Sequence, residues 1–159
     1  MNHADKAYNL FLQDYNCAQS VLCAYEDITG FDRETAARIA SSFGAGMGRL
    51  REVCGAVSAA LMILGLACGY ADPGDQEAKA LHYQRVQEYA QRFRDANGSI
   101  LCRELLEDVS VTPGAAPEAR TPEYYATRPC PQLVRKAAAI LDEMLADRQI
   151  TIHDEEEHL

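Results

Sequence analysis

The chain has 159 residues, which suffices for one domain with a sizeable core. Hydrophobic residues make up 48% and charged residues 25% of the sequence, which is typical of a globular protein and excludes a disordered, collagen-like or many-span membrane chain. The net charge of −9 opposes binding to nucleic acid or to anionic lipid, because both require clustered Lys and Arg.

Six cysteines are scattered along the chain, and no CxxC pair occurs among them: Cys17, Cys23, Cys54, Cys68, Cys102 and Cys130. The N-terminal segment contains acids and no apolar run long enough for a signal peptide, so a cytoplasmic protein with reduced thiols is expected. The sequence therefore favours structural thiols, metal ligands or redox chemistry over disulfide staples.

Helical periodicity dominates and strand patterns are nearly absent, which predicts an all-α, single-domain bundle of about six to seven helices. The first helix is expected at residues 3–13. The second follows the N-cap Asn16 and reaches residue 25, and the third follows Asp32 and ends at residue 43. Three glycines in residues 44–49 then predict a flexible joint with positive φ and close backbone approach.

Residues 53–70 carry no charge, so a membrane span has to be weighed against a buried helix. As a helix this segment measures roughly 27 Å, just short of the about 30 Å of a bilayer's hydrocarbon core. Its many small residues favour close packing by neighbouring helices. We therefore predict an apolar central helix at residues 52–70 and no membrane span.

Two further helices, a loop and a final helix are predicted in the remaining sequence. One helix is expected from Asp72-Pro73 to residue 96 and a shorter one from the cap Ser99 to residue 106. The proline-rich segment 109–128 predicts a long loop, of a kind that often serves as a lid or a partner surface. The final helix starts at residues 129–131, the helical domain ends at residue 147, and the acidic tail 148–159 is predicted to be disordered.

Four cysteines fall in or beside the first turn of a predicted helix: Cys17, Cys54, Cys102 and Cys130. Unpaired N–H groups and the helix dipole favour a thiolate there, which predicts lowered pKa values and either nucleophilic or metal-binding thiols. Cys23 lies about 120° around the helix from Cys17, and Cys68 lies about 21 Å along the helix from Cys54. We expect both of these to be small buried hydrophobic residues.

These positions carry a family resemblance. The segment GAGMG at 44–48 followed by Cys54-Gly55-Ala56, with Asn16-Cys17 upstream and single cysteines at 102 and 130, resembles the C_GCAxxG_C_C family of redox-active proteins over about residues 6–145. The resemblance implies a small helical, cytoplasmic protein, often encoded beside transporter genes, that acts through its four cysteines. Glycines are expected to support the site through the backbone, at Gly44, Gly46, Gly48 and Gly55. The closing glycine of the motif is Ala59 here. Its extra methyl group removes no thiol, so we expect it to affect the close approach of a ligand more than the chemistry of the thiols.

Three functions remain open at this point. In the first, the protein is a thiol–disulfide oxidoreductase that exchanges electrons with an unidentified donor or acceptor and needs no cofactor. Sequence does not determine which thiols pair, and pairing of consecutive family cysteines would join Cys17 with Cys54 and Cys102 with Cys130.

In the second, the same four thiolates bind Zn²⁺ or an iron–sulfur centre, although intervals of 36, 47 and 27 residues are atypical of such sites. In the third, the thiols only pack, and the acidic surface binds a transport-associated partner. A homodimer is compatible with the glycine-rich central helix. The dithiol function is the favoured one.

Overall fold

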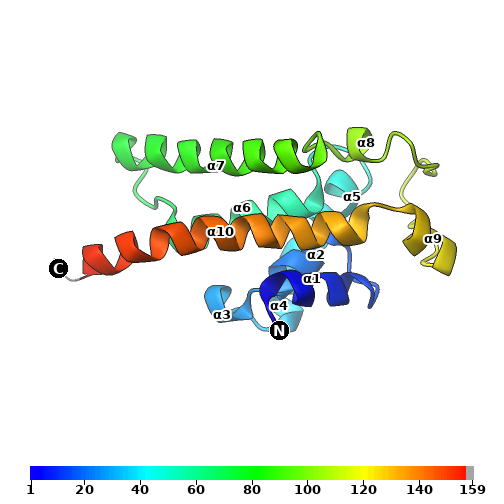
Figure 1. Ribbon diagram of the computed structural model, residues 1–159, viewed down its shortest axis with the longest axis horizontal. Helices are drawn as coiled ribbons and strands as arrows, with labels where there is room; N and C mark the ends of the chain where they lie inside the picture. Colours follow the sequence, from blue (N-terminus) through cyan, green and yellow to red (C-terminus); the bar gives the residue numbers. More distant parts are fainter. Residues whose placement is uncertain (157–159) are drawn as a thin grey trace.

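The apolar segment in the middle of the sequence forms helix α6 (Gly55–Cys68), and the helices α2, α3, α7 and α10 all contact it. The structure is a computed structural model that describes the backbone of residues 1–156 and the side chains of residues 1–147. The fold is all-α and forms a single domain around α6, as the sequence predicts (Figure 1). Within the described residues, none of the helices combines the length and hydrophobicity that a membrane crossing requires.

Helices α2 (Cys17–Cys23) and α4 (Arg33–Ala40) begin where their capping side chains, Asn16 and Asp32, predict. Helix α1 (His3–Phe11) lies along α10, and α2 packs against both α6 and α4. Asn16 and Gln19 form a reciprocal capping box at the start of α2. The predicted second helix is shorter than expected, because α2 ends at Cys23. A separate short helix that the sequence analysis did not predict, α3 (Glu26–Thr29), follows it and ends at the left-handed Gly30. A short 3₁₀ turn η1 (Ser41–Phe43) extends α4.

The long helices α7 (Gln76–Asn97) and α10 (Cys130–Glu156) run side by side in opposite directions (Figure 1). Two buried tyrosines tie the core to the backbone of α10. The hydroxyl of Tyr89 donates to the carbonyl of Ala137 at 2.8 Å, and that of Tyr25 donates to the carbonyl of Ala138 at 2.9 Å. Each buried phenol therefore has the polar partner that its burial requires.

Several predicted boundaries in the second half are wrong. Helix α7 begins after Asp75, because Asp72 accepts a hydrogen bond from Gly74 and forms a turn instead of a cap. The short helix α8 is Cys102–Leu105, since the Ser99 hydroxyl accepts from the Leu101 N–H and holds the preceding turn. The predicted loop 109–128 contains helix α9 (Pro122–Thr127), capped by Thr121 and with Pro122 in its first turn.

Helix α10 continues to Glu156, past residue 147 where the sequence predicts the helical domain to end. The rest of that predicted disordered tail, residues 157–159, lies outside the described residues, as do the side chains from residue 148.

Candidate functional site

Each of the four family cysteines stands at the start of a helix, as the sequence predicts. Cys17 is the first residue of α2, Cys102 the first of α8 and Cys130 the first of α10. Cys54 is the residue immediately before α6. The four helix starts lie close enough together for all four cysteines to border the same cavity.

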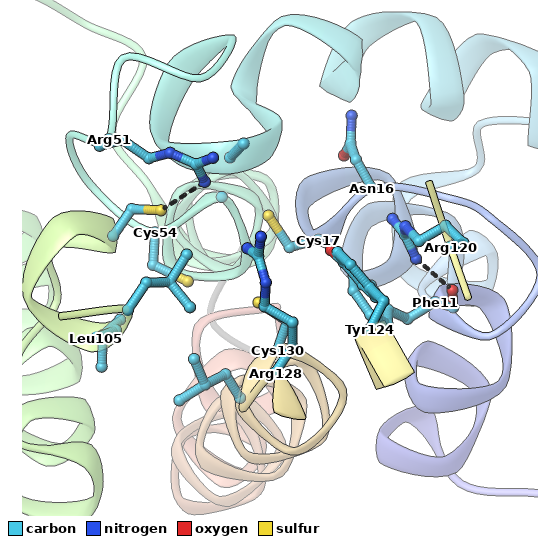
Figure 2. A pocket seen from close by; sticks show the side chains of 15 residues that line it. Phe11, Asn16, Cys17, Arg51, Cys54, Leu105, Arg120, Tyr124, Arg128 and Cys130 are labelled. Carbon is cyan, nitrogen blue, oxygen red and sulfur yellow. Dashed lines mark hydrogen bonds between the residues drawn. The ribbon is translucent and has the colours of Figure 1, made fainter. Parts of the chain in front are cut away.

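The four cysteines line one cavity with a volume of about 80 Å³. All of them are free thiols (Figure 2). Cys54 and Cys102 are buried, while Cys17 and Cys130 are half-buried. Cys23 and Cys68 do not line this cavity. Cys23 is buried, as expected, whereas Cys68 lies half-buried at the end of α6, which differs from the prediction.

A left-handed turn stands beside the cavity, where the sequence predicts a flexible joint. Its first part is the short helix α5 (Gly44–Met47). The φ angles of residues 45 to 49 are all positive, between 56° and 70°, and Arg51 also has a positive φ of 61°. Hydrogen bonds close the turn, including one from the Gly48 N–H to the Gly44 carbonyl at 2.8 Å. The segment is therefore an ordered turn of left-handed helix, which L-residues rarely form.

The glycines of this region permit close approach. A Cβ on Gly46 would lie 2.6–2.8 Å from the backbone of residues 51 and 52, and a Cβ on Gly44 would lie 2.4 Å from the Asn16 side chain. A Cβ on Gly55 would lie 2.6 Å from the sulfur of Cys17. A Cβ on Gly48 would make an ordinary contact of 3.7 Å with the carbonyl oxygen of Ser42, but the φ of Gly48 is 58°. Gly44, Gly46 and Gly55 thus allow close approach of neighbouring segments, and Gly46 and Gly48 adopt positive φ, whereas Gly44 does not.

A short antiparallel bridge joins the segments that carry Cys54 and Cys102. Val53 pairs with Leu101, the Cys54 N–H donates to the Ile100 carbonyl at 2.8 Å, and the Cys102 N–H donates to the Glu52 carbonyl at 2.7 Å. Cys54 and Cys102 flank the paired residues and thus share one face of the bridge. This pairing fixes two of the four thiols relative to each other.

The predicted lowering of the thiol pKa values is wrong for three of the four cysteines. Burial raises the pKa of Cys17, although the N–H groups of Ala45, Ala18 and Gly55 favour its thiolate. Cys17 is half-buried as a residue, and desolvation by the surrounding protein is the largest influence on the pKa of its thiol.

Burial likewise raises the pKa of Cys54 well above its ordinary value and that of Cys130 to about 12, and the neighbouring Cys17 thiol raises both further. Desolvation of the charged form therefore outweighs the helix N-termini.

Arginines, which the sequence analysis did not single out, form the polar part of the cavity wall. Arg51, Arg120 and Arg128 line the cavity, and Arg51 donates to the sulfur of Cys102 at 3.7 Å. Arg128 is buried, forms an ion pair with Glu118, and lies with its guanidinium over the ring of Tyr124. The signal that could have identified Arg51 and Arg128 is their position in the sequence, next to the glycine turn and two residues before the last cysteine.

The long loop closes one side of the cavity through arginine contacts. Arg120 donates to the backbone carbonyls of Phe11 and Tyr15 at 2.9 and 3.1 Å, and its guanidinium lies 4.2 Å from the centre of the Phe11 ring (Figure 2). Arg49, in the left-handed turn, donates to the carbonyls of Thr112 and Gly114. The loop is thus held against both α1 and the glycine turn.

Metal-ligand geometry is absent among the side chains that the structure describes, since no group of three or more His, Cys, Asp or Glu is arranged to hold an ion. The zinc or iron–sulfur alternative therefore draws no support from the arrangement of the thiols.

The fold and the cavity define a class: small all-α proteins in which cysteines from separate helix starts share one cavity. A family model described as "Putative redox-active protein (C_GCAxxG_C_C)" matches residues 15–144. The chain belongs to this family, as the sequence resemblance implies. No curated protein and no solved structure shows significant similarity to the chain.

Proposed function

We propose that the protein is a thiol–disulfide oxidoreductase whose electrons reside in the four cavity thiols. One observation carries the proposal: free thiols from four distant parts of the chain line a single cavity of about 80 Å³. Cysteines that serve only as small apolar residues have no reason to share a cavity with arginines. Membership of a family described as redox-active supports the same chemistry.

The exchange begins when one cavity thiol loses its proton and attacks a sulfur of a substrate disulfide. A mixed disulfide forms, the substrate S–S bond breaks, and the first substrate sulfur leaves as a thiolate that takes up the proton. A second cavity thiol, also deprotonated, then attacks the protein sulfur of the mixed disulfide. The intrachain disulfide forms and the second substrate thiol leaves, so that two electrons and two protons have passed to the substrate.

Cys17 is the common neighbour in this exchange. Its thiol interacts electrostatically with those of Cys54, Cys102 and Cys130. A disulfide between Cys17 and any of these partners can therefore pass to another by thiol–disulfide exchange, provided the sulfurs come within bonding geometry. The pairings Cys17–Cys54 and Cys102–Cys130 stay part of the proposal.

The raised pKa values favour a reducing couple. A dithiol becomes a strong oxidant when its reduced form is stabilised, commonly as a thiolate. Burial has the opposite effect here, because it disfavours the thiolates of Cys17, Cys54 and Cys130. We therefore propose that the protein donates electrons to its substrate and not the reverse.

The test is redox titration of the reduced protein in glutathione buffers, with thiols counted in denaturant and disulfides mapped by mass spectrometry. We expect two or four thiols to be lost reversibly, all from the cavity. A single Cys→Ser variant at either cysteine of a mapped disulfide should remove that disulfide, while the matched controls Cys23→Ser and Cys68→Ser should titrate as wild type. Reversible loss confined to Cys23 or Cys68, or no disulfide at any poise, would overturn the proposal.

A further inference from the structure

The cavity has a cationic wall in an otherwise acidic protein. The whole chain carries a net charge of −9, yet Arg51, Arg120 and Arg128 line the cavity and none of its lining residues is Asp or Glu. Arg49 lies close by, and the guanidinium groups of Arg49 and Arg51 disfavour the charged form of Arg128. Positively charged side chains are therefore concentrated at this cavity.

Carboxylates offset only part of this charge. Glu118 pairs with Arg128 and lies 3.9 Å from Arg49. Of the four arginines in and beside the cavity, Arg49 and Arg128 form ion pairs with described side chains, and Arg51 and Arg120 do not. Arg120 directs its donors to backbone carbonyls, and of the arginines that line the cavity Arg51 has the fewest partners.

Arg51 has a donor with nothing to bind. Its Nη1 reaches the sulfur of Cys102, whereas its Nη2 is buried and has no hydrogen-bond partner. A buried charged donor is costly to leave unpaired, so such a group calls for a ligand or another functional explanation. The positive φ of Arg51 and the approach of Gly46 to its Cα hold the residue in this position.

From these observations we infer that the cavity binds a small oxygen-bearing anion at the guanidinium of Arg51, beside the thiol of Cys102. A guanidinium offers parallel donors that match the oxygens of carboxylates and tetrahedral oxoanions. A cavity of about 80 Å³ has room for roughly five water-sized groups, which limits the ligand to a small anion. The inference rests on the proposed function in one respect, because it takes the cavity as the place where the thiols meet their substrate.

Two alkylating reagents of similar size test this assignment: anionic iodoacetate and neutral iodoacetamide. The rate ratio of iodoacetate to iodoacetamide is measured at Cys102 and Cys17 by peptide mass spectrometry, in native protein and again in urea. We expect the native ratio to exceed the denatured ratio at least fivefold, and sulfate to abolish this preference while chloride at equal ionic strength does not. Equal native and denatured ratios would overturn the inference.

Variants assign the effect to one side chain. Arg51→Met should return the ratio to its denatured value, while the matched control Arg103→Met, an exposed arginine paired with Glu52, should leave the ratio unchanged. If Arg51→Met does not fold, Arg51→Gln takes its place with the same expectation, and an unchanged ratio in the folded variant refutes the role of Arg51. Alkylation transfers no electrons between thiols, so this result is independent of whether the cavity forms disulfides.

Discussion

Gly55 is the position where the link between packing and thiol geometry can be tested most directly. It is the first residue of α6, and its backbone does not require glycine by its φ angle. A Cβ there would lie 2.6 Å from the sulfur of Cys17 and 2.6 Å from the carbonyl oxygen of Phe43. Ordinary contacts between carbon atoms are about 3.5–4.0 Å, so each neighbour would have to move by about 1 Å.

We expect Gly55→Ala to destabilise the protein by about 1–2 kcal/mol. Overpacking typically costs about 1–3 kcal/mol, and the higher helix propensity of Ala returns at most about 1 kcal/mol of that. Urea unfolding at neutral pH should show a lower midpoint with an unchanged slope, and the melting temperature should fall by roughly 2–8 °C. Displacement of the Cys17 sulfur should also slow disulfide formation in the cavity.

The same helix offers a matched control. A Cβ on Gly65 would meet only the Nε2 of His82, at 4.0 Å, which is an ordinary contact. Gly65→Ala should therefore stabilise the protein by about 0.5–1 kcal/mol through helix propensity alone. The reasoning is refuted if Gly55→Ala proves as stable as wild type, or if the two variants shift the urea midpoint in the same direction.

Three further predictions concern the alkaline limit of stability, the left-handed turn and the loop. Because burial raises the pKa of Cys130 from 9.0 to about 12, the stability that the neutral thiol contributes is complete below pH 9 and lost between pH 9 and pH 12. The free energy of unfolding, measured by urea titration, should fall by roughly 1 kcal/mol at pH 10 on this account, and Cys130→Ala should lessen the fall. Met47 is exposed and has a φ of 69°, so Met47→Gly should raise the free energy of unfolding by about 1 kcal/mol. Gly48→Ala should lower it by about 1–2 kcal/mol. Equal urea midpoints for the two variants would contradict the left-handed turn. Arg120→Met should make residues 109–128 more sensitive to limited proteolysis with little change in global stability, and an unaltered cleavage rate would show that Arg120 does not anchor the loop.

The sequence predicts those parts of the fold that are determined by interactions between residues close to one another in the chain. Asn16 and Asp32 cap their helices because their side chains reach the backbone N–H three residues later. Gly98 ends α7 because it adopts a left-handed conformation. The predicted start of α7 is three residues too early, because Asp72 and Asp75 are both suitable N-caps. The sequence pattern does not distinguish between them, and Asp75 is the one that caps the helix.

The cavity itself depends on packing between distant segments, which local patterns do not encode. The placement of Cys17, Cys54, Cys102 and Cys130 at helix starts follows from caps and glycines, but their meeting in one cavity follows from the packing of α2, α6 and α10. The sign of the pKa shifts depends on it too. A helix start alone favours the thiolate, and only the surrounding protein reveals that desolvation is the larger effect.

Strain in the left-handed turn is connected to the chemistry of the cavity. Four non-glycine residues of residues 45–51 have positive φ, and each such L-residue costs about 1–2 kcal/mol in this conformation. The N–H of Ala45 faces the sulfur of Cys17, and the side chain of Arg51 reaches the sulfur of Cys102. An extended or right-handed segment would relieve the strain but would direct both groups away from the thiols. The strained conformation of the turn therefore places a backbone donor beside the sulfur of Cys17 and a cation beside the sulfur of Cys102.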